Sequence, residues 1–82
     1  MKFVYVLNSE KTSIYYVGIT VNVDNRLKEH NRGKSKFTKG HRPWKLVYFE
    51  EAMDWKSARV REKYLKSAAG KMWLRKEGFI SD

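Results

Sequence analysis

Phe3-Val4-Tyr5 and Tyr16-Val17-Gly18 are two short tyrosine motifs near the start of the chain, and their tyrosines stand eleven residues apart. Each motif lies in an apolar run, residues 2–7 and 14–19, that is rich in β-branched and aromatic side chains. Nearly continuous apolar runs of this length are typical of strands that are covered on both faces. The polar segment between them is short, so we expect an antiparallel hairpin.

The segment after the hairpin predicts a helix. Asn22 is a favourable N-cap, and Asp24 follows in the first turn, where negative charge suits the helix dipole. We expect this helix to run through about Asn31 and to stop at Gly33. Gly18 precedes it, and we expect a close approach between its backbone and a neighbouring helix.

The second half of the chain predicts one further strand and more helix. Residues 33–43 form a basic segment that we expect to be a loop, and residues 44–49 then have the composition of a strand. Asp54 is the expected N-cap of a second helix, which Gly70 should end or kink. Residues 72–73 suggest a short final helical piece.

Length and composition indicate one domain over residues 1–82. The chain has three Trp, five Tyr and four Phe, each of which buries about 150–250 Å², and it has no Cys. There is therefore no disulfide framework and no zinc site built on Cys. No apolar run approaches the ~20 residues that span a bilayer. The start lacks the pattern of a signal peptide, so we expect a cytoplasmic location and no membrane partner.

Positive charge is concentrated in one part of the chain. The formal net charge is +9, and residues 26–45 contain eight Lys and Arg against a single acid, Glu29. Such a block favours a polyanion partner, although a solvated surface that serves only solubility is the alternative. The candidate nucleic-acid-binding residues are Lys34, Lys36, Lys39, Arg42 and Lys45.

Glu62 interrupts an apolar stripe in the second predicted helix. The stripe steps by three and four residues through Trp55, Ala58, Glu62, Leu65 and Ala69. A carboxylate in that position is costly unless something compensates its charge. Two alternatives stay open: an ion pair with an arginine of the same fold, or a hard cation such as Mg²⁺, which one carboxylate can hold together with waters and phosphate oxygens.

Four further side chains have chemistry suited to a phosphodiester. Tyr5 and Tyr16 are either ordinary strand aromatics or hydroxyls that reach one end of the sheet, where a lowered pKa would let them act on a water. Arg26 and His30 are one helical turn apart. Both are common surface residues. The guanidinium of Arg26 can also donate two hydrogen bonds to one phosphate, and the imidazole of His30 can also serve as a base.

Taken together, these residues resemble the GIY-YIG nuclease superfamily, in particular its small single-domain bacterial members. The two tyrosine motifs match the motifs that name the family, with only the Tyr kept in the first and Val in place of Ile in the second. Residues 16–33 resemble the family's region from the second motif into the following helix, and residues 34–48 resemble its small subgroup. Residues 59–66 resemble the helix that carries the family's catalytic Glu. Ile19 and Leu74 differ from the pattern of many members.

The resemblance implies an α+β fold with a three-stranded antiparallel sheet flanked by helices in the order β-β-α-β-α-α. It implies an endonuclease that depends on Mg²⁺ or Mn²⁺ and acts on nucleic acid, DNA rather than RNA. By the same resemblance, Tyr5 and Tyr16 place or deprotonate the attacking water. Arg26 binds the scissile phosphate, His30 is a base or a phosphate contact, and Glu62 holds the metal.

Two other functions compete with this one. The first is a nucleic-acid-binding domain with weak or no catalysis. The second is a basic adaptor that docks an acidic protein surface, which would leave the two tyrosine motifs and Glu62 without a purpose.

Overall fold

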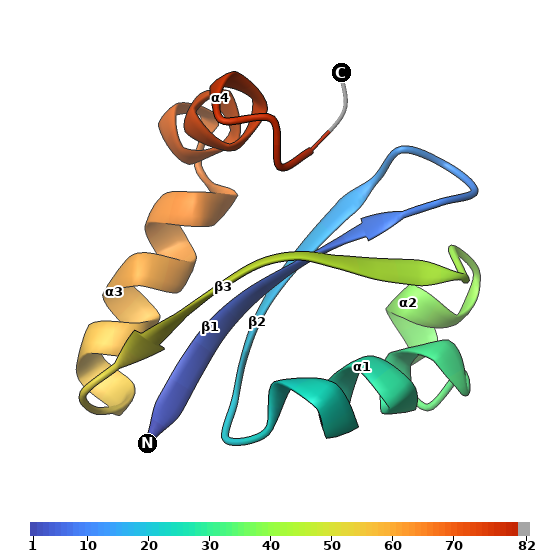
Figure 1. The fold of residues 1–82 in the computed structure, drawn as a ribbon, viewed down its shortest axis with the longest axis horizontal. Helices are drawn as coiled ribbons and strands as arrows, with labels where there is room; N and C mark the ends of the chain where they lie inside the picture. Colours follow the sequence, from blue (N-terminus) through green and yellow to red (C-terminus); the bar gives the residue numbers. More distant parts are fainter. Residues whose placement is uncertain (81–82) are drawn as a thin grey trace.

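The sheet is a three-stranded antiparallel layer with the first strand at its centre. In the computed structural model, which describes residues 1–80, the strands are β1 (Lys2–Ser9), β2 (Tyr15–Thr20) and β3 (Trp44–Ala52). Their order in space is β2-β1-β3, and both pairings are antiparallel (Figure 1). The three predicted strands are therefore confirmed. The third is longer than expected because two acidic residues, Glu50 and Glu51, continue it.

The helices confirm the predicted α+β order with one addition. They are α1 (Val23–Asn31), α2 (Lys36–Lys39), α3 (Trp55–Lys66) and α4 (Ala68–Lys76). The short helix α2 lies inside residues 33–43, which the sequence predicted as a loop. Four residues are too few for a periodic pattern, so the composition of this segment gave no sign of a helix.

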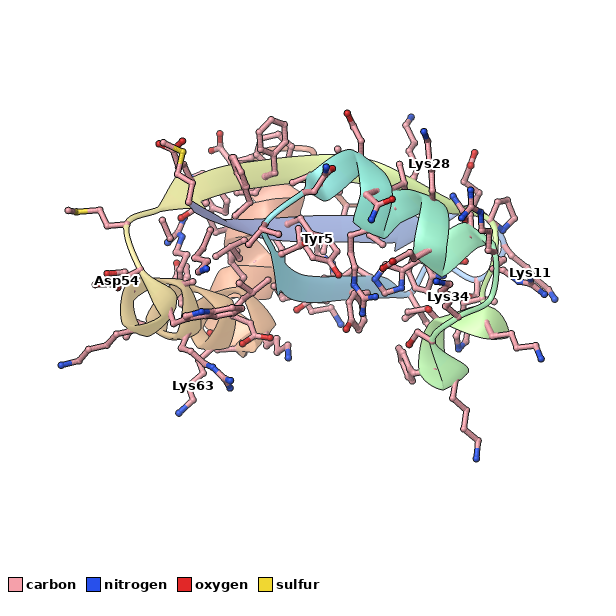
Figure 2. The ribbon with its side chains drawn as sticks, turned by 90° about the horizontal axis from the view of Figure 1, so that it is seen from below. Tyr5, Lys11, Lys28, Lys34, Asp54 and Lys63 are labelled. Atoms are coloured by element: carbon pink, nitrogen blue, oxygen red, sulfur yellow. The ribbon has the colours of Figure 1, made fainter. Side chains whose placement is uncertain are left out.

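Helices cover both faces of the sheet, and this is why β1 is apolar along its whole centre. Val4 and Val6 pack on one face against a core supplied by α3 and α4. Tyr5 and Leu7 pack on the opposite face, together with the buried Trp44 of β3 and side chains of α1. Figure 2 shows α1 in front of the strands and α4 behind them. The two faces divide the molecule into two small cores.

Side chains at the helix starts satisfy backbone N–H groups that have no partner within the helix. Asn22 accepts a hydrogen bond of 3.0 Å from the backbone N–H of Asn25, and Asp54 accepts one of 2.8 Å from Ser57. Each such cap contributes about 1 kcal/mol. The same bonds to the N–H groups at the start of α3 lower the pKa of Asp54. Both predicted helix starts are confirmed.

The predicted role of Gly70 is wrong, and the junction of the last two helices explains why. Ser67 lies at the end of α3 and also caps α4, so α3 already ends at Lys66. Gly70 is buried within α4, where a Cβ atom would overlap the carbonyl oxygen of Tyr64 and lie 2.6 Å from the Cα of Leu65. A glycine is needed here because the backbones of α3 and α4 touch.

We expect Gly70→Ala to destabilise the fold by about 1–3 kcal/mol, since a Cβ would force the two backbones apart. Thermal or urea unfolding measures the change. Gly40→Ala is the matched control, because Gly40 has φ −75° and no heavy atom within 4 Å of an added Cβ. That substitution should change stability by less than about 1 kcal/mol. Equal effects of the two substitutions would contradict the packing argument.

Candidate active site

The centre of the candidate site is Tyr5, whose side chain lies across Gly18. The two residues face each other in the register of β1 and β2. A Cβ atom on Gly18 would stand 2.5 Å from the Tyr5 hydroxyl oxygen. The close approach expected at Gly18 is thus present, but its partner is a side chain of the next strand rather than a helix. The tyrosine of the first motif and the glycine of the second therefore form one structural unit.

Tyr16 lies beside Tyr5 on the same face of the sheet. It stands two residues before Gly18 on β2, which makes it the diagonal neighbour of Tyr5, and the ring centroids are 6.2 Å apart. Tyr5 is almost fully buried, whereas Tyr16 is half-buried. Its ring also contacts those of His30 at 4.9 Å and Trp44 at 6.3 Å. The hairpin brings the two tyrosines together, as predicted.

His30 connects Tyr5 to the basic segment through two short hydrogen bonds. Its Nε2 lies 2.8 Å from the Tyr5 hydroxyl, and its Nδ1 lies 2.8 Å from the hydroxyl of Thr38 in α2. The Thr38 hydroxyl donates in turn to the carbonyl oxygen of Ser35 at 3.5 Å. These bonds are mutually consistent when Nδ1 carries the proton and Nε2 accepts from Tyr5.

Burial sets the protonation of this pair. His30 is 0% exposed, and burial lowers its pKa to about 4, so the imidazole is neutral at pH 7. Burial also raises the pKa of Tyr5 to about 12, an effect that the nearby Arg26 guanidinium offsets in part. Tyr5 therefore keeps its proton at neutral pH. The lowered pKa that a role as base would require is not present at this tyrosine.

Arg26 lies on α1 next to these groups, and Glu29 holds it in place. Its Nη1 donates to the Glu29 carboxylate at 2.9 Å, and this bond is the main reason that the pKa of Arg26 is raised and that of Glu29 lowered. The guanidinium carries five N–H donors in a planar fork. One donor engaged by Glu29 fixes the plane of the fork and leaves others for a phosphate.

Glu62 belongs to the opposite layer of the molecule. It lies on α3, which packs on the face of the sheet that carries Val4 and Val6. Its carboxylate accepts a 3.0 Å bond from Lys66, one turn along, rather than from the arginine that the sequence offered as an alternative. Arg61 of the same helix instead bonds to Glu50 of β3 at 2.9 and 3.0 Å.

The apolar stripe predicted around Glu62 is narrower than expected. Ala58 and Leu65 are buried, but Trp55 is half exposed beneath Lys2, and Ala69 is an exposed residue of α4. The Glu62 side chain keeps 17% of its surface exposed. It is a largely buried carboxylate, and the ion pair with Lys66 offsets part of the cost of its burial.

The structure brings together four of the five predicted catalytic residues. Tyr5, Tyr16, Arg26 and His30 are linked by the contacts above, and Glu62 shares no contact with them among those of residues 1–80. The donors also limit the kind of metal site. Nowhere in residues 1–80 do three or more His, Asp or Glu side chains gather in a way that would hold a metal ion. A lone carboxylate fits Mg²⁺, which takes most of its ligands from water and phosphate.

Three of the five basic candidates line one hollow beside α2. An open hollow of about 810 Å³ is lined by Lys36, Lys39, Arg42 and also by Lys11 of the hairpin loop. Lys34 lies at the same end of the molecule as Lys11 (Figure 2). Lys45 lines a different hollow beside residues 78–80. The structure therefore groups Lys36, Lys39 and Arg42 around one hollow. Lys34 lies 4.0 Å from the Glu29 carboxylate instead, and Lys45 lies apart from both.

Backbone contacts hold this basic segment against the hairpin. The Ser9 hydroxyl donates to the carbonyl oxygen of His41 at 2.6 Å. The backbone N–H of Glu10 donates to the carbonyl oxygen of Pro43 at 2.9 Å. The indole of Trp44 donates to the carbonyl oxygen of Thr38 at 2.8 Å. These three bonds hold the second half of the segment, from residue 38 to residue 43.

Three residues of the site were missed by sequence reasoning. Glu29 holds Arg26, Thr38 holds His30, and Phe37 places an exposed ring 6.2 Å from that of Tyr16. The i,i+3 spacing of Arg26 and Glu29 was a usable signal. Thr38 and Phe37 had no such signal in the sequence, because the residues that they contact are farther away along the chain.

Comparison with known proteins identifies the arrangement. Residues 1–76 match the GIY-YIG catalytic domain. The chain belongs to the GIY-YIG family. It is 44% identical over 80 residues to a UPF0213 protein of Syntrophus aciditrophicus, a match that covers 92% of this chain and 90% of the relative. It is 43% identical over 67 residues to one of Clostridium perfringens, covering 80% and 71%.

A solved structure supports the same family and the fold. The solution NMR structure of a UPF0213 protein from Bacillus halodurans is similar with a TM-score of 0.56 and 32% identity, covering 95% of this chain and 86% of that one. GIY-YIG proteins are a nuclease family whose members generally use divalent metals. Within residues 1–80, no helix has the length and apolar character that crossing a bilayer requires.

We expect the buried His30 of this GIY-YIG domain to make its stability depend on pH. Between pH 6.5 and about 4, the unfolded chain binds a proton that the folded protein excludes. The free energy of unfolding should therefore decrease as pH falls through that window, by about 3 kcal/mol from this group alone. Urea unfolding of the wild type and His30→Gln from pH 7.5 to 4 measures the difference.

Gln is polar but does not titrate, so the gap in stability between the two proteins should shrink as pH falls. Both proteins contain the same carboxylates, Glu29 and Asp54 among them. The effects of carboxylate titration on the free energy of unfolding therefore cancel when the two proteins are compared. A gap that stays constant across the range would show that His30 is not held neutral.

Proposed function

We propose that this protein is a metal-dependent endonuclease that hydrolyses phosphodiester bonds of nucleic acid, with DNA as the expected substrate. The observation that carries the proposal is the grouping of Tyr5, Tyr16 and Arg26 on one face of the sheet, which the bond between His30 and Thr38 connects to the basic segment around α2. A phosphate clamp, positioned hydroxyls and a cationic surface are what binding and hydrolysis of a polyanion require. We expect it to act in the cytoplasm.

In this proposal, Arg26 binds the scissile phosphate. Its fork is oriented by Glu29 and suits two oxygens of one phosphate. Negative charge grows on those oxygens in the transition state, so a guanidinium fixed beforehand stabilises the transition state more than the bound substrate.

Tyr5 and Tyr16 position the attacking water, and His30 positions Tyr5. The Tyr5 hydroxyl donates its proton to His30 and has lone pairs left to accept a hydrogen bond. A hydroxyl of raised pKa fits orientation of a water better than removal of its proton. Because His30 is fully buried, it acts through Tyr5 rather than on the phosphate.

Glu62 would hold Mg²⁺ or Mn²⁺. When bound, such an ion supplies charge stabilisation at a phosphoryl oxygen and lowers the pKa of a coordinated water. The donor set agrees with this assignment, since a single largely buried carboxylate relies on substrate and water for the remaining ligands.

A nucleic-acid-binding domain without catalysis is the second candidate, and two observations favour it. Tyr5 is held in its protonated form, and Glu62 lies on the layer behind the sheet. A protein that binds but does not cut would keep the basic hollow and tolerate both features.

Glu62→Gln should abolish cleavage while leaving the fold intact, because an amide keeps the shape and removes the charge that a hard cation needs. The assay incubates branched, nicked, single-stranded and duplex DNAs and RNAs with Mg²⁺, with Mn²⁺ and with chelator. Lys66→Gln is the control. It breaks the same ion pair, worth about 0.3–0.5 kcal/mol, but keeps the carboxylate, and should cleave normally.

If Glu62→Gln lowers thermal stability and spares cleavage, Glu62 is an ion-pair residue and not a ligand. If the wild type binds the substrates but cleaves none of them with either metal, the binding domain is the better description.

Replacing Lys34, Lys36 and Lys39 with Gln should weaken DNA binding and flatten its salt dependence. Each phosphate contact contributes about 0.9 to the slope of log affinity against log salt on duplex DNA, so three contacts give a change of about two to three. Lys56, Lys63 and Lys76, which are exposed on α3 and α4, form a control triple with the same change in net charge. Binding titrations over a range of salt concentrations, in chelator, measure the affinity and its salt dependence for each triple variant.

The control triple should leave the slope close to that of the wild type. Equal losses in both triples would mean that overall charge, and not the segment around α2, attracts the nucleic acid.

A further inference from the structure

Phe37 presents an exposed aromatic ring beside the candidate site. It lies on α2, and 57% of its surface is exposed. Its ring centroid is 6.2 Å from that of Tyr16 and 5.5 Å from that of His41. The next residue, Thr38, is fully buried and bonded to His30, so the backbone that carries the ring is anchored to the core.

Single exposed apolar residues are common and need no function. Two others on this protein have neighbours that account for them. Phe49 packs edge-on against Phe3 at 6.1 Å, and Trp55 lies under the ammonium group of Lys2 at 4.7 Å. Phe37 differs from them in its place, because its ring lies beside Tyr16 of the candidate site and within the basic segment.

The charge around Phe37 is of one sign. The chain has no acidic residue between Glu29 and Glu50, and it has six Lys and Arg in that interval. Lys36 and Lys39 belong to the same short helix as Phe37 and line the hollow. An exposed aromatic ring within a basic segment of ordered backbone is the combination by which proteins bind single-stranded nucleic acid: the bases stack and the phosphates pair with the cations.

We propose that Phe37, backed by Tyr16, is a stacking platform for an unpaired base, and that the substrate class is therefore nucleic acid with unpaired nucleotides next to the scissile phosphate. Continuous duplex offers no free base face, because each base is already stacked within the helix. A single strand, a flap or an opened end offers one. This inference rests on the proposed function, since it assigns the substrate of the same site.

The test is equilibrium binding in chelator, so that no cleavage intervenes. The probes are a labelled oligothymidylate of about 12 nucleotides, within the site sizes of single-strand binding proteins, and a blunt duplex of equal length. Phe37→Ala should weaken binding to the single strand about 5- to 150-fold, the range measured for loss of one stacked base. Binding to the duplex should change less than about 2-fold, because its phosphate contacts remain.

Two variants make the test specific. Phe37→Trp keeps a stacking face and should bind the single strand as well as the wild type does. Phe49→Ala removes a ring with a similar exposure, 53%, on the strand β3 and should leave both affinities unchanged. Circular dichroism and thermal unfolding confirm that each variant is folded.

Equal weakening of both probes by Phe37→Ala, or no effect on either, would overturn the stacking platform and leave the nuclease proposal standing. A wild type that binds neither probe would overturn the proposed function, and the platform with it.

Discussion

The hydrogen bond between the Tyr5 hydroxyl and His30 is the contact on which the arrangement of this GIY-YIG domain depends. Tyr5 belongs to the central strand, lies across the bare backbone of Gly18 in the next strand, and reaches a histidine near the end of α1. The other nitrogen of that histidine bonds to Thr38 in α2. One buried chain of polar groups thus joins the three elements β1, α1 and α2, and each group in it is satisfied only if the others are in place.

The same burial restricts the chemistry open to the site. It favours the neutral forms of both Tyr5 and His30, so neither group is ready to carry charge at neutral pH. The charged groups lie around this pair: Arg26 with its Glu29 on α1, and the lysines around α2. A neutral, rigid centre with cations at its margin is suited to orienting a water and a phosphate, and leaves charge stabilisation to the arginine and to any bound metal.

Local patterns predicted most of the fold, and distant contacts account for the errors. The hairpin and the start of α1 follow from apolar runs and from the Asn22 cap, which involve neighbours in the sequence. The helix α2 was missed because its buried residue, Thr38, is fixed by a histidine eight residues earlier. Gly70 was read as a helix end because its contact with the preceding helix has no local signature. Glu62 was placed in a stripe that the break at Ser67 cuts short.

The bonds from Ser9 and Glu10 to residues 41 and 43, together with that of Thr38 to His30, have a thermodynamic consequence. Many arginine- and lysine-rich segments are disordered alone, and part of their binding energy is then lost in ordering the chain. Here the backbone of the basic segment is already ordered in the free protein. Association therefore has only the side chains and the ligand to immobilise, so the affinity of this surface reflects its contacts rather than coupled folding.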